Sequence, residues 1–589
     1  MAATERASAP GEEDGENRFE VLFYRLSPES SEGASPLSGE PARRGWLAEG
    51  ATILEGARTA GFPIATDCGG FGKCTRCRVI PLGSADPNQG PPAWLGPPNP
   101  AEALQLSREE LRAGWRLACQ VRVEGRLAVL APPPGESPVP KTMDTSLPLR
   151  IDPWCCGNGI SSQAKAYGAV VDIGTTNLCG YLIDLETGAL LAEASRPNSQ
   201  RTWGADLMTR VLAASPRETG GGGAGEELTR AVRHDVDFLL TDLLRSIRAR
   251  RSQVAGLVFA GNSVMHHLFL GMPVESFGTA PYAPLADGGV PFRPREAGLR
   301  LPASAEAHFL PLLAGFVGAD AVGVALALGL GRPERKSVCL ALDLGTNVEI
   351  LLGTPGGGIW CASTPAGPAF EGGEIRCGMG VGPGAICAME PGEGDFTLRT
   401  VGGLSASGIC GTGLIEAAAG LLDLGVVDPS GKIRAAAALK EGPLRRRIIE
   451  EEGGRGVLLG GGGKGGAVVL TQGDVRKLQA AKAAVRAGAE LLLQEAGLRW
   501  GQVDEVCLAG AFGAHLRPER ACRIGLLPRE SAGRVRVVNN AAASGARLAL
   551  LSRAELARAS SLKSKARYVE LAGRKDFQDS FIEELAFPG

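Results

Sequence analysis

Apolar and polar positions along the chain predict two similar strand–turn units. AVVDIGTTN (Ala169 to Asn177) is an apolar run that ends in Asp172 and a Gly-Thr-polar turn, and LALDLGTNVEI (Leu340 to Ile350) repeats this pattern around Asp343. In each copy the apolar run predicts a buried strand and the turn predicts the start of a hairpin. Strand-like runs alternate with helical segments after both copies, which indicates α/β architecture built twice on one plan.

The two turns carry residues that suit a phosphate group. They are Gly174, Thr175 and Thr176 in the first copy and Gly345, Thr346 and Asn347 in the second. Glycine lets the backbone approach closely, while amides and hydroxyls donate to phosphate oxygens. Asp172 and Asp343, at the strand ends, can hold a divalent cation through water, as magnesium usually requires. One such turn would be ordinary, but two can face each other across a cleft and bind one polyphosphate.

Two further glycine elements follow the second turn. In GICGTGLIEAAAGLL, the residues Gly411, Thr412 and Gly413 open a predicted helix, whose N-terminus favours phosphate. VCLAGAFG is a predicted buried strand that ends in Gly510-x-x-Gly513, where a close backbone approach suits an adenosine. Each alone is an ordinary strand–turn–helix junction. Their order after two phosphate turns favours a nucleotide site.

The first part of the chain carries a different chemistry. FEVLFYRL predicts a strand and ATILEGARTAG a helix, and a C-x5-C-x2-C loop with a distant fourth cysteine follows them. The four cysteines are Cys68, Cys74, Cys77 and Cys119. This spacing is close to that of plant-type [2Fe–2S] ferredoxins, and the loop glycines allow amides to reach the cluster sulfurs. Zinc is the alternative, but zinc sites usually offer two C-x2-C pairs. The alternating QVRVEGRLAVL predicts a closing hairpin of a small β-grasp domain.

Composition narrows the functional classes. A net charge of −2 gives no reason to expect nucleic acid or an anionic membrane as a partner. No apolar stretch reaches the ~18 residues that span a bilayer. Most of the 14 cysteines are scattered, several in apolar runs, which favours a reducing cytosol over a disulfide framework. The acidic start of the chain is unlike a secretory leader and predicts a disordered tail.

Twelve sequence blocks occur in collinear order along the chain. They are CGGFGKCTRC, GWRLACQ, VVDIGTTN, GADLMTRV, GNSVMHHLFLG, PLLAGFVGAD, DLGTNVEI, TPAGPAFEGGEIRCGM, GICGTGLIEA, LTQGDVRKLQAAKAAVRAG, LAGAFG and IGLLP. Together they resemble the reductive activators of corrinoid proteins, whose ATPase has the actin, sugar-kinase and heat-shock-chaperone (ASKHA) fold. The resemblance runs from about residue 19 to the C-terminus.

The resemblance implies a cytoplasmic ATPase whose N-terminal [2Fe–2S] domain passes single electrons to the corrinoid protein of a methyltransferase system. It implies that Co(II) returns to Co(I), that ATP and Mg²⁺ are bound, and that an upstream low-potential donor supplies electrons. The four cysteines are then cluster ligands, the two turns are phosphate loops, and Gly510 to Gly513 is the adenosine loop. Glu371 and Glu374 in FEGGE are weaker candidates for acid/base or partner-coupling roles, with a solvated loop as the alternative.

The expected organisation is a disordered tail, a ferredoxin-like β-grasp domain, a linker and two ATPase lobes. The boundaries are 1–18 for the tail, 19–131 for the [2Fe–2S] domain, 132–166 for the Pro-rich linker with a reduced middle region, 167–335 for lobe I and 336–589 for lobe II. The family usually has a middle domain ahead of the first turn, and its shortening here makes the implied homodimer less secure.

Two other functions remain open from the sequence. One is a small-molecule kinase of the same fold with a structural, cysteine-bound metal, although no substrate aspartate can be identified. The other is a redox-regulated nucleotide-binding sensor. The colour of the purified protein distinguishes an iron–sulfur protein from a zinc protein.

Overall fold

The structure is a computed structural model of the 589-residue chain. It describes residues 18–25, 41–62, 64, 70, 72, 77–83, 90–106, 108–132, 143–147, 150–155, 165–204, 206–216, 223–451, 454–461, 466–510 and 516–589. The chain forms two compact units. Unit 1 contains Met1–Gly135 and Ser199–Ala213, and unit 2 contains Glu136–Asn198 and Ala214–Gly589.

Unit 1 is built on a five-stranded sheet with the order β2-β1-β5-β3-β4. Strands β1 and β5 pair in parallel, and β2 and β3 flank them antiparallel. This confirms the ferredoxin-like β-grasp. The elements are β1 (Arg18–Arg25), β2 (Arg43–Ala48), α1 (Ile53–Thr59), β3 (Arg78–Leu82), α2 (Pro100–Gln105), α3 (Arg108–Arg112), β4 (Arg116–Leu117), β5 (Leu127–Ala131), η2 (Ser199–Thr202) and α4 (Leu207–Ala214).

Local sequence explains much of unit 1, with one difference. Thr52 and Glu55 form a capping box that starts α1, and Ile53, Leu54 and Ala57 bury its apolar face in the core. The expected hairpin after Cys119 is wrong in its first half. Residues 121–123 form only an isolated bridge between Arg122 and Thr52, so β5 alone is a strand there.

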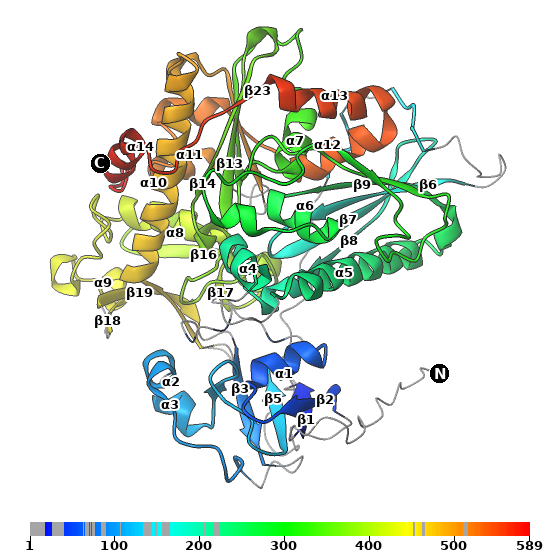
Figure 1. Cartoon of the computed structure of the whole chain (residues 1–589). Helices are drawn as coiled ribbons and strands as arrows, with labels where there is room; N and C mark the ends of the chain where they lie inside the picture. Colours follow the sequence, from blue (N-terminus) through cyan, green and yellow to red (C-terminus); the bar gives the residue numbers. More distant parts are fainter. Residues whose placement is uncertain are drawn as a thin grey trace. The chain divides into compact units, whose positions relative to one another are not determined.

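The first lobe of unit 2 is a six-stranded sheet with the order β10-β11-β9-β6-β7-β8. Strands β6 and β7 form the hairpin that the apolar run and its Gly-Thr turn predicted, and the long helix α5 packs along β7 and β8 (Figure 1). The elements are β6 (Tyr167–Ile173), β7 (Asn177–Asp184), β8 (Leu190–Pro197), α5 (Gly225–Ser246), β9 (Val254–Gly261), α6 (Ser263–Leu270), β10 (Val290–Phe292), β11 (Glu306–Phe309) and α7 (Ala319–Ala327).

The second lobe repeats the arrangement. Strand β12 lies between β13, its antiparallel hairpin partner, and β21, its parallel neighbour, as β6 lies between β7 and β9. The central elements are β12 (Cys339–Leu344), β13 (Asn347–Gly353), β14 (Ile359–Pro365), α8 (Gly411–Asp423), α10 (Gln472–Glu495), β21 (Glu505–Gly510), α11 (Pro518–Arg523), β22 (Val535–Val537), β23 (Ala566–Tyr568) and α14 (Lys575–Glu583).

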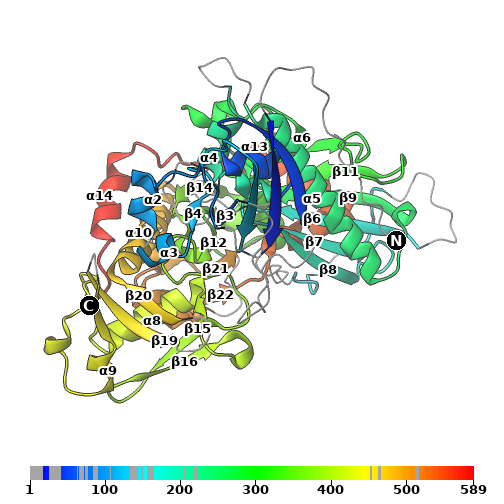
Figure 2. The same cartoon turned by 90° about the horizontal axis from the view of Figure 1, so that it is seen from below.

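Two three-stranded sheets and α8 lie together on one side of this lobe (Figures 1 and 2). Their elements, with the short helix α9, are β15 (Ala385–Pro391), β16 (Phe396–Thr400), β17 (Gly408–Ile409), α9 (Pro443–Arg446), β18 (Ile448–Glu451), β19 (Gly454–Gly461) and β20 (Ala467–Thr471). None of the described helices combines the length and apolar character that a membrane crossing requires.

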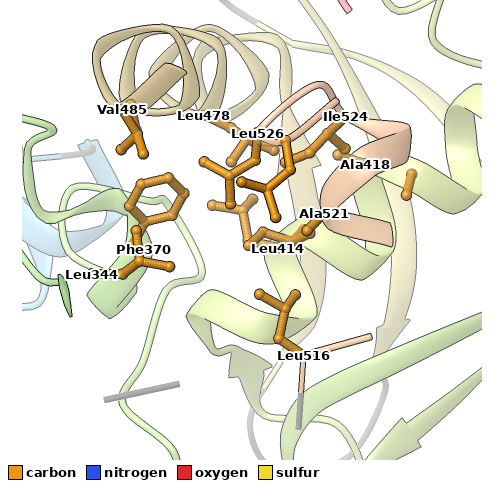
Figure 3. Packing of buried hydrophobic residues seen from close by; sticks show 14 of the residues in the cluster. Leu344, Phe370, Leu414, Ala418, Leu478, Val485, Leu516, Ala521, Ile524 and Leu526 are labelled. Atoms are coloured by element: carbon orange, nitrogen blue, oxygen red, sulfur yellow. The ribbon is translucent and has the colours of Figure 1, made fainter. Parts of the chain in front are cut away.

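The core of the second lobe joins α8, α10 and α11 beneath the second turn (Figure 3). Leu414 of α8 and Leu478 and Val485 of α10 are fully buried there. Phe370, on the segment that leads to Glu371, packs into the same cluster and is also fully buried. The apolar core therefore fixes the backbone that presents Glu371.

Helix α12 (Ala541–Leu551) returns to the first lobe and packs on β6, β9 and α7, followed by α13 (Arg553–Lys565). Its backbone approaches α7 so closely that a Cβ at Gly323 would overlap the carbonyl of Ala542. This approach brings together the starts of α7 and α12, which carry Asp320 and Asn540.

Candidate functional site

Both predicted phosphate turns are tight hairpin turns at the ends of buried strands. The Gly174 N–H donates to the Asn177 carbonyl at 3.0 Å, which leaves Thr175 and Thr176 at the tip. A Cβ on Gly174 would lie 2.6 Å from that carbonyl oxygen, and one on Gly345 would lie 3.1 Å from the Asn347 oxygen. Close backbone approach therefore requires glycine at position 174 in the first turn and favours glycine at position 345 in the second turn.

Glu371 joins the two turns. It ends the short helix η6 (Pro368–Glu371), and its Oε2 accepts hydrogen bonds from the Thr176 hydroxyl at 3.0 Å and the Thr346 hydroxyl at 3.1 Å. The turns from the two lobes thus converge on one anionic oxygen. A phosphate oxygen suits the same donors.

A group of carboxylates lies beside the turns. Asp172 is buried and accepts from the Asn540 amide at 2.8 Å, while Asp343 is directly opposite Glu349 in the β12–β13 hairpin. Burial, followed by the negative charges of Asp343 and Asp172, raises the pKa of Asp320 to about 7. Burial and the charges of Asp320 and Asp343 raise the pKa of Glu349 well above its usual range.

Such a carboxylate group can hold a divalent cation or a proton. Asp320 is the member best placed to exchange a proton near neutral pH, because its pKa lies there. Carboxylate oxygens are ligands that Mg²⁺ prefers, so Asp172 and Asp343 fit the predicted magnesium site chemically. Their roles stay predictions.

Glu374 is not brought into this group. Its side chain is 57% exposed, its carboxylate lies 3.9 Å from Lys477 Nζ, and its backbone is left-handed with a φ of 57°. Glu371 and Glu374 were predicted together, and only Glu371 reaches the turns.

The glycines at the start of α8 are packed against the protein itself. A Cβ at Gly411 would overlap the carbonyl oxygen of Phe370, and one at Gly413 would overlap that of Ile386. Thr412 is 1% exposed. These residues thus seat α8 beneath the Glu371 segment, and phosphate binding by them stays a prediction.

Gly510 ends β21 beside the second turn. It pairs with Leu344, has a φ of 109°, and a Cβ there would overlap the Leu344 carbonyl oxygen. This position, next to Gly345, fits the predicted adenosine loop. Gly513 lies outside the described residues.

Two of the four predicted cluster cysteines are described, and they lie together in unit 1. Cys77 and Cys119 are both buried, with their sulfurs 3.5 Å apart, and the Gln120 amide donates to the Cys119 sulfur at 3.4 Å. Two thiolates on one tetrahedral metal with ~2.3 Å bonds are roughly 3.8 Å apart, so the pair fits one metal centre. Cys68 and Cys74 lie outside the described residues.

Sequence reasoning missed Asp320, Glu349, Asn262 and Asn540. Asn262 caps α6 and donates to the Thr175 hydroxyl at 3.1 Å, and Asn540 caps α12. Both asparagines carry the helix-start signal of an N-cap residue, which by itself does not indicate a functional site. Glu349 had a signal too, because the three-residue turn 345–347 pairs Leu344 with Val348 and so places Glu349 opposite Asp343.

Family models and similar proteins agree on both halves of the chain. The model described as the C-terminal domain of RACo, the ASKHA domain, matches residues 337–589, and the RACo middle region matches residues 167–333. The 2Fe-2S iron-sulfur cluster binding domain matches residues 47–124. The middle-region match includes the first turn and does not include residues 132–166.

Two relatives and one solved structure are similar over most of the chain. The corrinoid activation enzyme RamQ of Eubacterium limosum is 32% identical, over 72% of this chain and 71% of that protein. The [Co(II) methylated amine-specific corrinoid protein] reductase of Methanosarcina barkeri is 26% identical, over 72% of this chain and 77% of that protein. A solved structure of a reductive activator for a corrinoid, iron-sulfur protein is 26% identical with a TM-score of 0.68, and the match covers 97% of this chain and 98% of the other.

Proposed function

Because the chain belongs to the RACo family of reductive activators of corrinoid proteins, we propose that it uses ATP to reduce a corrinoid protein from Co(II) to Co(I). One observation carries the proposal. A single chain holds a buried thiol pair in a β-grasp unit and two phosphate turns that meet at Glu371. The [2Fe–2S] cluster supplies one electron at a time.

The described residues support specific roles. Cys77 and Cys119 would bind one metal centre of the cluster, and the proposed ligand set is completed by Cys68 and Cys74, which lie outside the described residues. The Gln120 amide, which donates to the Cys119 sulfur, stabilises the charged thiolate. Asp172 and Asp343 would hold Mg²⁺, which would neutralise phosphate charge.

The nucleotide site acts through a change of hydrogen-bond partner. ATP phosphate oxygens take the donors of Thr176 and Thr346 and displace the Glu371 carboxylate. Gly510 gives the adenosine access to the backbone beside the second turn. Asp320 belongs to the same carboxylate group, where burial and the charges of Asp343 and Asp172 raise its pKa to about 7.

ATP is needed because the electron transfer is uphill. Plant-type clusters lie near about −400 mV. If the Co(II)/Co(I) couple of the corrinoid lies ~100 mV below the cluster potential, each electron transferred costs about 2.3 kcal/mol. ATP binding changes how often each arrangement of the two lobes is populated. The arrangement that ATP favours then favours a different state of the docked corrinoid.

Partners and location follow from the same chemistry. We propose that the corrinoid protein belongs to a methyltransferase system and that an upstream low-potential donor supplies the electrons. A cytoplasmic location agrees with the buried free thiols of Cys361, Cys410 and Cys522. The homodimer stays a prediction.

The absorption spectrum of the purified protein, with its iron and sulfide content, tests the redox half of the proposal. We expect visible charge-transfer bands that bleach on reduction. A colourless zinc protein would contradict electron transfer and favour a kinase with a structural metal. An anaerobic pull-down with ATP then identifies the corrinoid partner.

A further inference from the structure

Unit 1 contains a second piece of chain that comes from the middle of lobe I. Residues 199–213 lie between β8 and α5 in the sequence, yet they belong to the compact unit that holds Cys77 and Cys119. The chain therefore passes from unit 2 to unit 1 at Asn198–Ser199 and returns at Ala213–Ala214. The last residue of unit 2 before the first crossing point is hydrogen-bonded to the first phosphate turn.

Asn198 is that residue. Its N–H donates to the Thr176 carbonyl at 2.9 Å, and its side-chain amide donates to the Gly174 carbonyl at 2.9 Å. The side chain is 1% exposed. Both acceptors belong to the turn whose hydroxyl bonds to Glu371, so a change in the turn's backbone is passed directly to Asn198.

The segment after Asn198 is braced internally. Helix η2 begins at the next residue, and the fully buried Arg210 of α4 donates to the Gly204 carbonyl at 2.9 Å and to the Gln200 side chain at 3.2 Å. Breaking a buried, charged hydrogen bond is costly. The described residues of this segment, 199–204 and 206–213, are therefore expected to move as one body.

Arg58 connects this segment to the cluster-binding fold. It lies in the last turn of α1, its Nε donates to the Thr202 carbonyl at 2.7 Å, and Nη2 donates to the same oxygen. The guanidinium also lies over the Trp203 ring, 5.5 Å from its centroid. Helix α1 leads into the cysteine loop, whose first cysteine, Cys68, is ten positions after Arg58.

We propose that residues 198–213 form a coupling segment, with Asn198 and Arg58 as positioning residues, that transmits the state of the first phosphate turn to α1 ahead of the cysteine loop. The inference rests on the proposed function, for which it supplies the physical link between ATP and electron delivery. The segment is attached to the first phosphate turn through Asn198 and to α1 through Arg58, so a change at either attachment shifts the position of the segment.

Hydrogen–deuterium exchange of the full holoprotein, with and without a non-hydrolysable ATP analogue and Mg²⁺, tests the link. The key variant is Arg58→Met. The matched control is Arg25→Met, because Arg25 also donates to a carbonyl, that of Pro132 at 2.9 Å, and also lies over a ring, that of Phe62 at 3.9 Å.

We expect the analogue to change exchange in residues 170–177 and also in residues 53–62, in the wild type and in Arg25→Met. Arg58→Met should keep the exchange response in residues 170–177 and lose the response in residues 53–62. Asn198→Ser, altered at the other end of the segment, should also lose the response in residues 53–62. An unchanged α1 in the wild type, or an equal α1 response in Arg58→Met, overturns the proposal.

Corrinoid reduction gives the functional readout. In Arg58→Met the ATP-dependent rate of Co(I) formation should fall about tenfold, within the usual range of an allosteric coupling. ATP hydrolysis and the visible spectrum should stay as in the wild type, and Arg58→Lys should recover part of the rate. Wild-type reduction that is independent of ATP would defeat the proposed function. ATP-dependent reduction that survives in Arg58→Met would defeat only the coupling segment.

Discussion

At the scale of single residues, Glu371 is the point at which the two halves of the nucleotide site meet. One carboxylate oxygen accepts the hydroxyls of Thr176 and Thr346, which are the groups that a phosphate needs. Hydrogen bonds to charged groups are worth roughly 1.5–3 kcal/mol each. The Glu371 carboxylate therefore competes with the ATP phosphates for the hydroxyl donors of Thr176 and Thr346.

Replacing this charge should strengthen ATP binding. In Glu371→Gln the competing acceptor is neutral and its hydrogen bonds are weaker, so we expect the Kd for ATP to fall about three- to tenfold. Titration calorimetry measures it. Glu374→Gln is the matched control, because Glu374 is exposed and should leave the Kd unchanged. Equal Kd values for the two variants would contradict the role of Glu371.

Asp320 makes a prediction about pH. Its folded pKa of about 7 is above the unfolded value of about 3.9, so the folded state binds the extra proton between these values. Stability from this group is therefore present below about pH 4, falls as pH rises from about 4 to 7, and is lost above pH 7. Asp320→Asn should add little stability at about pH 4 and more at about pH 8. Urea unfolding at both pH values checks this, and an equal difference at both would contradict it.

At the scale of elements, local patterns predicted the hairpins but could not distinguish a packing role from a ligand-binding role for the glycines at the start of α8. The β6–β7 and β12–β13 hairpins follow from an apolar run that ends in a short Gly-Thr turn, which is local information. A glycine needed for a ligand and a glycine needed for packing have the same sequence signal. The start of α8 shows this, because Gly411 and Gly413 contact backbone carbonyls that only the tertiary fold brings near.

The packing of α8 gives a stability prediction. In Gly411→Ala the new Cβ overlaps the Phe370 carbonyl, and overpacking of this kind costs about 1–3 kcal/mol. Gly473→Ala is the control, since Gly473 lies in the first turn of α10 with its nearest neighbour 3.6 Å from a Cβ. Alanine there should be neutral or stabilising. Chemical unfolding measures both, and equal destabilisation would contradict the account.

At the scale of the whole molecule, the sequence was informative about the class of each unit and less so about how the chain is shared between them. The cysteine spacing predicted an iron–sulfur site, the repeated turns predicted an α/β fold built twice around a phosphate, and the resemblance to the corrinoid-protein activators implied a two-lobed ATPase. Neither pattern predicted that α12 packs on the first lobe or that residues 199–213 join unit 1. These depend on contacts between segments far apart in sequence, such as that between Gly323 and Ala542.

Separate sites for electrons and nucleotide predict separable defects. Cys77→Ser removes a cluster ligand, so it should abolish the visible bands and Co(I) formation while ATP binding stays within about twofold of the wild type. Asp343→Ala should keep the bands and weaken Mg²⁺-dependent ATP hydrolysis. Absorption spectra and phosphate release measure these effects. A loss of both activities in each folded variant would argue against separate sites.

The ATP dependence of corrinoid reduction is the most direct test of the central claim. The holoprotein is mixed anaerobically with a low-potential reductant and a Co(II) corrinoid protein, and Co(I) is followed by its visible absorption, with and without ATP and Mg²⁺. We predict that Co(I) accumulates only with ATP in the wild type and in neither condition with Cys77→Ser. Equal accumulation of Co(I) without nucleotide would contradict the account.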